Sequence, residues 1–348
     1  MNLRLLEVHR DQFVLSYNGI AFIPLHDPRL NEVRNAIGRI CSQLQYEDLE
    51  LEDEPSLMRD AISLLQEWSG WIANQESGTK AHLFIDCISL ATSEWLSDWE
   101  QYVFVATDGD FAIWADPPNV DFILDWIWRR FHVQISYRLV HFQMPFHLKN
   151  DYLFNVALYH ELGHYIDSQL MVTNNMAMSM TQQWLALNPN CGIRNKMSWD
   201  NNTYIFQNHL KELFADLFAV QYVDESLINY MEFKYGYTST DESTTHPSSQ
   251  FRIDMLRDFC QGAQDNPIIN ELSKALHAVA NRKLTRITCP VQDLLLTSCN
   301  FDSVHHIFLS AWYTFHHHTE VRKIPTNMIY PQVCEAVARN INMFITQN

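Results

Sequence analysis

The chain has 348 residues, 47% of them hydrophobic and 19% charged, a balance that is typical of globular proteins and excludes a disordered chain. Aspartate and glutamate outnumber lysine and arginine by 41 to 24, so the net charge of −17 argues against nucleic acids and anionic membranes as partners. Glycine is scarce, at 9 residues, and no Gly-rich phosphate-binding loop occurs.

The cellular compartment is predicted from the cysteines and from the absence of targeting patterns. The seven cysteines are odd in number and form no Cys-x-x-Cys pair, which favours a reducing compartment over a disulfide framework. The N-terminal residues lack the apolar core of a signal peptide, and no run of 18 residues is apolar throughout. We therefore expect a cytoplasmic protein without a membrane span.

The first part of the chain predicts both strands and helices. Asn18-Gly19 is a strong turn pattern between two apolar segments and predicts a β-hairpin over residues 13–25. Apolar residues at helical spacing predict helices over residues 29–45 and 55–73. The apolar run over residues 81–90 predicts a buried strand.

The middle of the chain predicts more strands before a long helical part. Residues 102–106 and 111–115 flank a Thr-Asp-Gly-Asp turn and predict a second hairpin. A helix is expected over 119–130, and the alternation of apolar and polar residues predicts a strand over 132–140. The remaining helices are expected over 150–170, 205–223, 248–262, 266–284, 302–319 and 327–346.

These elements predict an α+β fold that is mainly helical, with a small antiparallel or mixed sheet in its N-terminal part. We divide the chain into an N-terminal α/β accessory lobe (1–130), a central core (131–262) and a C-terminal helical region (263–348).

The sequence His160-Glu161-Leu-Gly-His164 is the first chemical motif. Residues at positions i and i+4 of a helix share a face, so the two imidazoles can bind one zinc ion. Glu161 is then placed to take a proton from water that the zinc activates. The alternative is a helix whose two histidines form hydrogen bonds within the core.

A second helix supplies candidates for the third ligand that catalytic zinc requires. Glu212 and Asp216 are four residues apart in a strongly apolar segment, and two buried carboxylates each need a partner. Both carboxylates gain a partner if Glu212 binds the metal and Asp216 accepts a hydrogen bond from a ligand imidazole. A metal-bound histidine usually donates its other N–H to a carboxylate in this way. The alternative is a polar stripe on a surface helix.

A third element is the sequence Thr-His246-Pro, followed by Arg252, at the start of a further helix. A histidine before proline at a helix start is held rigidly, and it is placed to donate a hydrogen bond to the oxyanion of a tetrahedral intermediate. Arg252 is placed to orient one of the carboxylates. Alone, this sequence is an ordinary helix start.

Together the three motifs resemble zinc metallopeptidases of the gluzincin group, of the CAAX-prenyl-protease and membrane stress-protease type. The resemblance covers residues 150–260 and implies a zincin-like core with His160, His164 and Glu212 as zinc ligands and Glu161 as general base. It also implies that Asp216 supports a ligand histidine and that His246 and Arg252 line the site. In such enzymes an edge strand beside the motif helix pairs with the extended substrate, which assigns that role to strand 132–140.

We therefore expect a metalloprotease that holds one Zn²⁺ per chain and hydrolyses peptide bonds of an intracellular protein or peptide. The alternative is a catalytically silent zinc-binding interaction or regulatory protein, although a site that kept zinc only for structure would not require Glu161. Histidines 305, 306 and 316–318 are interpreted as the polar face of a helix, with a second metal site as the alternative. The sequence does not indicate an oligomeric state.

Overall fold

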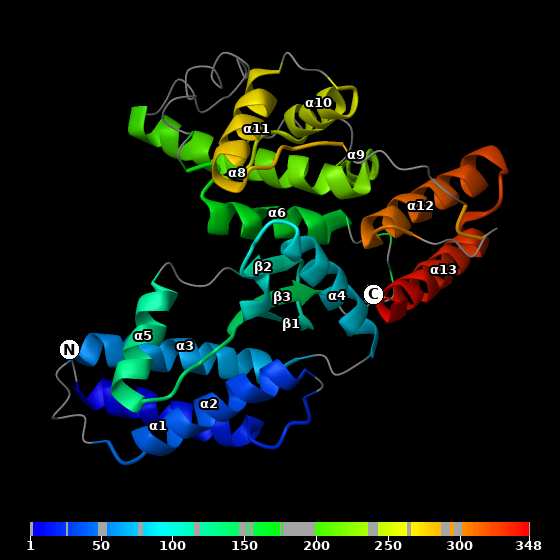
Figure 1. The fold of residues 1–348 in the computed structure, drawn as a ribbon. Helices are drawn as coiled ribbons and strands as arrows, with labels where there is room; N and C mark the ends of the chain where they lie inside the picture. Colours follow the sequence, from blue (N-terminus) through cyan, green and yellow to red (C-terminus); the bar gives the residue numbers. More distant parts are fainter. Residues whose placement is uncertain are drawn as a thin grey trace. The chain divides into compact units, whose positions relative to one another are not determined.

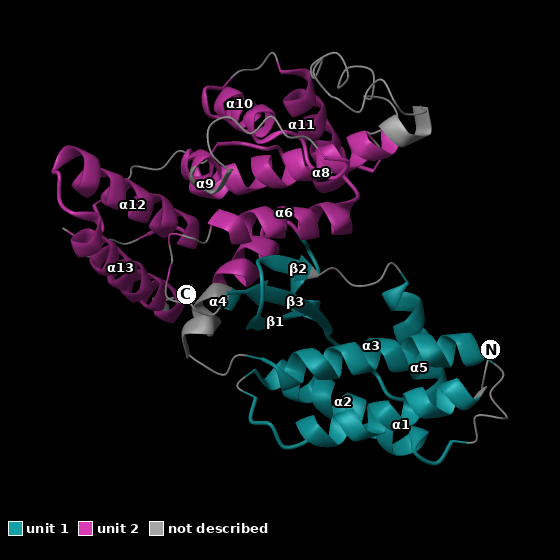
Figure 2. Cartoon of the chain, turned by 180° about the vertical axis from the view of Figure 1, so that it is seen from behind, with its two compact units in different colours: residues 1–85, 96–146 teal, residues 86–95, 147–348 magenta. Residues whose placement is uncertain are grey.

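The computed structural model describes residues 3–25, 27–47, 54–75, 79–114, 119–145, 151, 153, 156–174, 176, 199–235, 243–262, 266–286, 293–295 and 301–347. The chain divides into two compact units (Figure 2): unit 1 comprises Met1–Ile85 and Leu96–Phe146, and unit 2 comprises Asp86–Trp95 and His147–Asn348. The three-part division made from the sequence stays a prediction.

The structure is 71% helical with a small three-stranded mixed sheet, which confirms the predicted α+β, mainly helical class. None of the described helices combines the length and the hydropathy that a membrane span requires. Four α-helices and the sheet lie within unit 1, helix α4 (Thr79–Ser93) is divided between the two units, and the other described α-helices belong to unit 2 (Figure 2). Figure 1 labels the elements in chain order.

Helices α1 (Leu3–Ile20), α2 (Pro28–Leu44), α3 (Pro55–Ala73) and α5 (Val120–Phe131) form the helical part of unit 1. Helix α2 begins where expected because Pro28 occupies its first turn and the Asp27 side chain accepts a hydrogen bond of 2.8 Å from the Arg29 N–H. These helices share one core with the sheet, in which Phe13, Ile37, Trp68, Val105 and Leu139 are almost fully buried.

The hairpin predicted over residues 13–25 is wrong, because Asn18-Gly19 lies in the last turn of α1. The expected turn needs positive φ angles at both central residues, and neither residue has one. Leu6, Phe13 and Ile20 are instead buried at a spacing of seven residues, which places them on one helix face in the core. Burial of that face outweighs the local turn preference.

The strand predicted over residues 81–90 is also wrong, because this segment lies within helix α4 (Thr79–Ser93). A short apolar run does not distinguish a buried strand from a buried helix. The buried residues Cys87, Ile88, Ala91 and Thr92 follow the helical spacing, since the second pair lies one turn after the first.

The sheet contains strands β1 (Tyr102–Asp108), β2 (Ala112–Trp114) and β3 (Arg138–Met144), in the order β1-β3-β2. The predicted strands 102–106 and 111–115 exist, but they do not form a hairpin with each other. Strand β3 lies between them, parallel to β1 with Phe104 opposite Val140, and antiparallel to β2 with Ile113 opposite Phe142.

The strand predicted over 132–140 begins six residues later and occupies the centre of the sheet. Its residues 138–144 pair with β1, and residues 141–143 pair with β2 as well. Because residues 141–143 are paired on both sides, β3 is the central strand and not the edge strand that pairing with a peptide requires. The expectation that this strand binds an extended substrate is therefore wrong.

Unit 2 is built from helices, and its predicted helices are confirmed with shifted ends. They are α6 (Val156–Leu170), α8 (Trp199–Val223), α10 (Ser249–Cys260), α11 (Pro267–Ala280), α12 (Val304–His316) and α13 (Thr326–Gln347), and a further helix, α9 (Ser226–Tyr235), was not predicted. A π-helical turn (His317–Val321) follows α12, and a short 3-10 helix (Trp99–Gln101) precedes β1 in unit 1.

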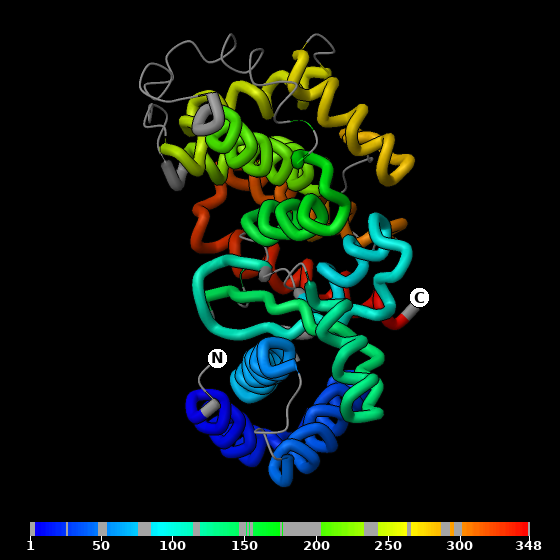
Figure 3. Tube along the Cα trace, turned by 90° about the vertical axis from the view of Figure 1, so that its left-hand side faces the viewer, coloured from blue at the N-terminus to red at the C-terminus, as the bar shows by residue number. Residues whose placement is uncertain are grey.

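Helices α6 and α8 lie side by side in unit 2, as Figures 1 and 3 show from two directions. The pair packs closely because Gly163 of α6 carries no side chain toward Ala215 of α8. A Cβ atom at Gly163 would lie 2.7 Å from the Ala215 Cα and 3.1 Å from its carbonyl oxygen. This close approach sets the distance between the two helices that carry the candidate ligands.

Candidate metal centre

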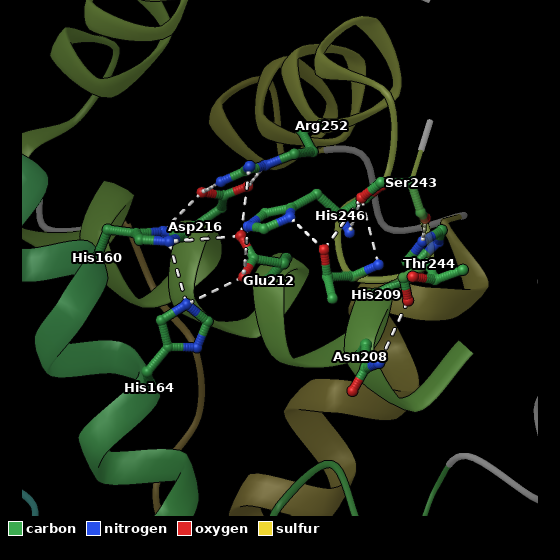
Figure 4. A network of polar contacts seen from close by, with 11 residues as sticks. His160, His164, Asn208, His209, Glu212, Asp216, Ser243, Thr244, His246 and Arg252 are labelled. Atoms are coloured by element: carbon green, nitrogen blue, oxygen red, sulfur yellow. Dashed lines mark hydrogen bonds and ion pairs between the residues drawn. The ribbon is translucent and has the colours of Figure 1, made fainter. Parts of the chain in front are cut away.

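Six of the seven predicted site residues, all except Glu161, come together from three segments of unit 2 (Figure 4). Helix α6 supplies His160 and His164, and helix α8 supplies Glu212 and Asp216. The segment that leads into α10 supplies His246, and α10 itself supplies Arg252. Of the described residues, only His160, His164 and Glu212 form a group of three or more potential ligands, with one ligand atom from each lying within 4.8 Å of the others.

The polar atoms of these three side chains converge closely enough to hold one metal ion. The His160 Nε2 and His164 Nε2 atoms are 3.2 Å apart. The Glu212 carboxylate lies 3.5 Å from the first nitrogen, through Oε2, and 3.3 Å from the second, through Oε1. Ligand atoms at 2.0–2.1 Å from a tetrahedral zinc are separated by about 3.3 Å, which the separation of the two imidazole nitrogens matches. Each nitrogen faces a different oxygen of the Glu212 carboxylate, and with one ligand atom per residue the three lie within 4.8 Å of one another.

Asp216 lies behind His160, on the side away from the ligand atoms. Its Oδ1 is 2.8 Å from the His160 Nδ1, although the angle at that nitrogen is poor for a hydrogen bond. A proton held on Nδ1 leaves the lone pair on Nε2, which faces His164 and Glu212. The structure thus places Asp216 next to His160, one of the candidate ligands.

Arg252 forms ion pairs with both buried carboxylates of α8. Its Nε and Nη2 atoms donate to Asp216 at 2.7 and 2.8 Å, and its Nη1 lies 3.3 Å from Glu212. All three residues are buried, and an unpaired charge there would be strongly unfavourable. The two-pronged contact fixes the Asp216 carboxylate in the plane of the guanidinium, and this carboxylate in turn orients His160.

The electrostatics of the site favour charged carboxylates. Burial alone would raise the pKa of Glu212, but hydrogen bonds from His160 and His164 and the charge of Arg252 hold it well below its usual range. Burial would lower the pKa of His160, but Asp216 and Glu212 raise it to about 10. A metal ion bound at Nε2 would take the place of the proton there, because imidazole binds metals in its neutral form.

His246 reaches the same site from the exposed side. Its Nε2 lies 3.5 Å from the Glu212 Oε1, and its Nδ1 is 2.7 Å from the Thr245 hydroxyl. The side chain is 56% exposed, whereas that of Glu212 is 11% exposed. His246 is not part of the three-residue ligand group, so its position suits a residue that contacts a bound substrate. Glu161, the proposed base, is half-buried on α6 directly after His160.

Two residues near the site were missed by the sequence reasoning. The His209 Nε2 donates to the Ser243 carbonyl at 2.8 Å, and the Asn208 amide donates to the Thr244 carbonyl at 3.2 Å. Burial lowers the pKa of His209 to about 4, so the ring is neutral at ordinary pH and carries its proton on Nε2. His209 is three residues and Asn208 four residues before Glu212 on α8, a spacing that places both near the face that carries Glu212.

Two of the clustered C-terminal histidines have polar partners inside unit 2. The His305 Nδ1 is 2.9 Å from the Tyr159 hydroxyl, and its Nε2 is 3.1 Å from Glu94. The His318 Nε2 is 2.8 Å from Asp293. Both rings are buried, and among the described residues neither belongs to a group of three potential metal ligands.

The donor set of two imidazole nitrogens and one carboxylate oxygen is the chemistry that zinc prefers, so these residues fit the ion that the sequence predicts. Comparisons with known proteins do not extend this assignment: no family model matches the chain, and neither the curated proteins nor the solved structures contain a match.

Proposed function

We propose that the protein is a zinc-dependent peptidase whose zinc ligands are His160, His164 and Glu212. The observation that carries the proposal is the convergence of the three side chains: the two Nε2 atoms are 3.2 Å apart, each lies within 3.5 Å of an oxygen of Glu212, and Glu161 directly follows the first histidine in sequence. Three protein ligands leave a fourth position open, as in catalytic rather than structural zinc sites.

The residues of the chain supply the remaining parts of peptide hydrolysis. Bound zinc lowers the pKa of water to about 7 and polarises a carbonyl group. Glu161 accepts the proton of the attacking water and returns it to the leaving amine. His246, on the exposed side of Glu212, donates a hydrogen bond to the oxygen that becomes negative in the transition state. Asp216 and Arg252 hold His160 and Glu212 in place.

The metal content of the purified protein tests this proposal. Close to one zinc per chain is expected, and His160→Ala or His164→Ala is expected to lose it because each variant leaves only two ligands. His277→Ala, which changes an exposed histidine on α11, is the matched control and should keep its zinc. Full zinc retention in both ligand variants would refute the site.

Glu212 and Asp216 are expected to differ sharply in their effect on zinc. Glu212→Ala removes a ligand and should empty the site. Asp216→Ala removes only the partner of the His160 Nδ1 and should weaken zinc binding by about 10- to 100-fold. Zinc titration against a competing chelator measures both, with circular dichroism as the control for folding. The reverse ranking would make Asp216 the ligand.

His246→Ala is expected to keep both zinc and fold, and to lower kcat by about 10²–10³-fold with little change in KM, because the hydrogen bond is formed in the transition state. Cleavage of a fluorogenic peptide library by the zinc-loaded protein measures the effect, with His277→Ala again as control. Loss of zinc would make His246 a ligand, and an unchanged kcat would leave it no role in catalysis.

A further inference from the structure

The turn that carries His246 is attached to the same helix that carries Glu212. The His209 Nε2 donates to the Ser243 carbonyl at 2.8 Å, and Asn208 donates to the neighbouring Thr244 carbonyl at 3.2 Å (Figure 4). His209 and Glu212 are three residues apart on α8 and therefore share a face. Helix α8 thus holds the Ser243 end of the 243–246 turn, and the His246 end of the turn faces Glu212 on the same helix.

The turn transmits this attachment to His246 through its own hydrogen bonds. The Ser243 hydroxyl accepts from the Thr245 and His246 N–H groups at 3.2 and 2.9 Å, and the Ser243 N–H donates to the His246 carbonyl at 3.0 Å. The Thr245 hydroxyl, 2.7 Å from the His246 Nδ1, then sets the orientation of the ring. Every step from His209 to the imidazole of His246 is a hydrogen bond of 3.2 Å or less.

The attachment is needed because the turn itself is exposed. All four residues from Ser243 to His246 are exposed, so packing does not restrain them, whereas His209 is fully buried in α8. A buried donor keeps its hydrogen bond because water does not compete for it. His209 therefore provides a rigid reference point inside unit 2 for a side chain that lies at the surface.

We propose that His209 is a positioning residue, which holds the 243–246 turn so that the His246 imidazole stays over the Glu212 carboxylate. The consequence for catalysis rests on the proposed function, whereas the positioning itself does not. Asn208 assists from the preceding position of α8. If His209 only stabilised the core, its loss would loosen unit 2 in general. If it positions the turn, its loss loosens residues 243–246 in particular, and the experiment distinguishes these two outcomes.

Hydrogen exchange measured by mass spectrometry on the full zinc-loaded chain tests the positioning without any substrate. His209→Leu should speed exchange of the Ser243, Thr245 and His246 amides by about 10-fold and leave the α6 amides unchanged. His209→Gln, whose amide can donate to the same carbonyl, should restore most of the protection. Unchanged exchange in His209→Leu, or a His209→Gln variant that behaves like His209→Leu, would overturn the proposal.

Kinetics of the same variants test what the positioning does. His209→Leu should lower kcat by about 10-fold with little change in KM and with zinc retained. In the His246→Ala background it should cause no further loss, because the residue acts only through His246. Independent, additive losses would show a general structural role and overturn the proposal.

Two controls separate the possible failures. A zinc-loaded wild-type chain that cleaves no peptide of the library refutes the proposed function, while the exchange data still decide the role of His209. If His209→Leu does not fold, Asn208→Ala is used together with His209→Gln. Faster exchange of the 243–246 amides in Asn208→Ala, by about 3-fold, is then expected, and no change overturns the proposal.

Discussion

Glu161→Gln is expected to keep one zinc per chain and to lower kcat by about 10²–10⁴-fold, the usual contribution of a general acid–base group. Glutamine has nearly the same shape as glutamate but cannot accept the proton of the attacking water. The half-buried position of Glu161 on α6, after His160, leaves the ligands themselves unaltered by this change. Metal analysis and cleavage of the peptide library measure the two effects on one sample.

The matched control is Glu271→Gln, which removes a carboxylate from the surface of α11 and should change neither zinc nor kcat. A Glu161→Gln variant with the activity of the wild type would exclude Glu161 as the base. A wild-type chain that holds zinc but shows no cleavage would instead favour the silent zinc-binding protein considered from the sequence.

Gly163→Ala is expected to destabilise the fold by about 1–3 kcal/mol and to weaken zinc binding by at least about 10-fold. The added methyl group would lie 2.7 Å from the Ala215 Cα, and a backbone atom cannot move aside as a side chain can. Helices α6 and α8 must therefore separate, which draws Glu212 away from both histidines. Denaturant unfolding and zinc titration measure the two effects.

Gly70→Ala is the control for this prediction, because Gly70 also lies within a helix, α3, but a Cβ atom there meets nothing within 4 Å. The substitution should stabilise unit 1 by about 0.4–1 kcal/mol, since alanine restricts the unfolded chain more than glycine does. A Gly163→Ala variant that gained stability in the same way would show that the close approach of α6 and α8 is not required.

The periodic spacing of apolar residues predicted most helices, because apolar residues at that spacing are the ones that a helix buries. The spacing of Leu30, Val33, Ile37 and Ile40 in α2 is the spacing of a helix face in the core. Local patterns were less reliable where burial opposed them, as at Asn18-Gly19 in α1. The order of the strands could not be predicted, since Phe104 and Val140 are neighbours in the sheet but 36 residues apart in sequence.

The candidate site was predicted largely from residue spacing, because both pairs, His160 with His164 and Glu212 with Asp216, are four apart and share a helix face. The nearness of the two faces depends on Gly163, whose role only the packing shows. His209 was missed because a single buried histidine in an apolar helix is ordinary, and its partner is a backbone carbonyl, which every residue possesses.

The contacts made by α8 do not allow residues to be inserted or deleted between positions 208 and 216. Asn208, His209, Glu212 and Asp216 lie within little more than two turns, and each makes its contact from the same side of the helix. One residue inserted or deleted between positions 208 and 216 would rotate the residues on either side of it by about 100° relative to each other. A substitution on the opposite face of α8 leaves this alignment unchanged. Any change of length in the stretch would instead turn His209, Glu212 and Asp216 away from their common side of the helix.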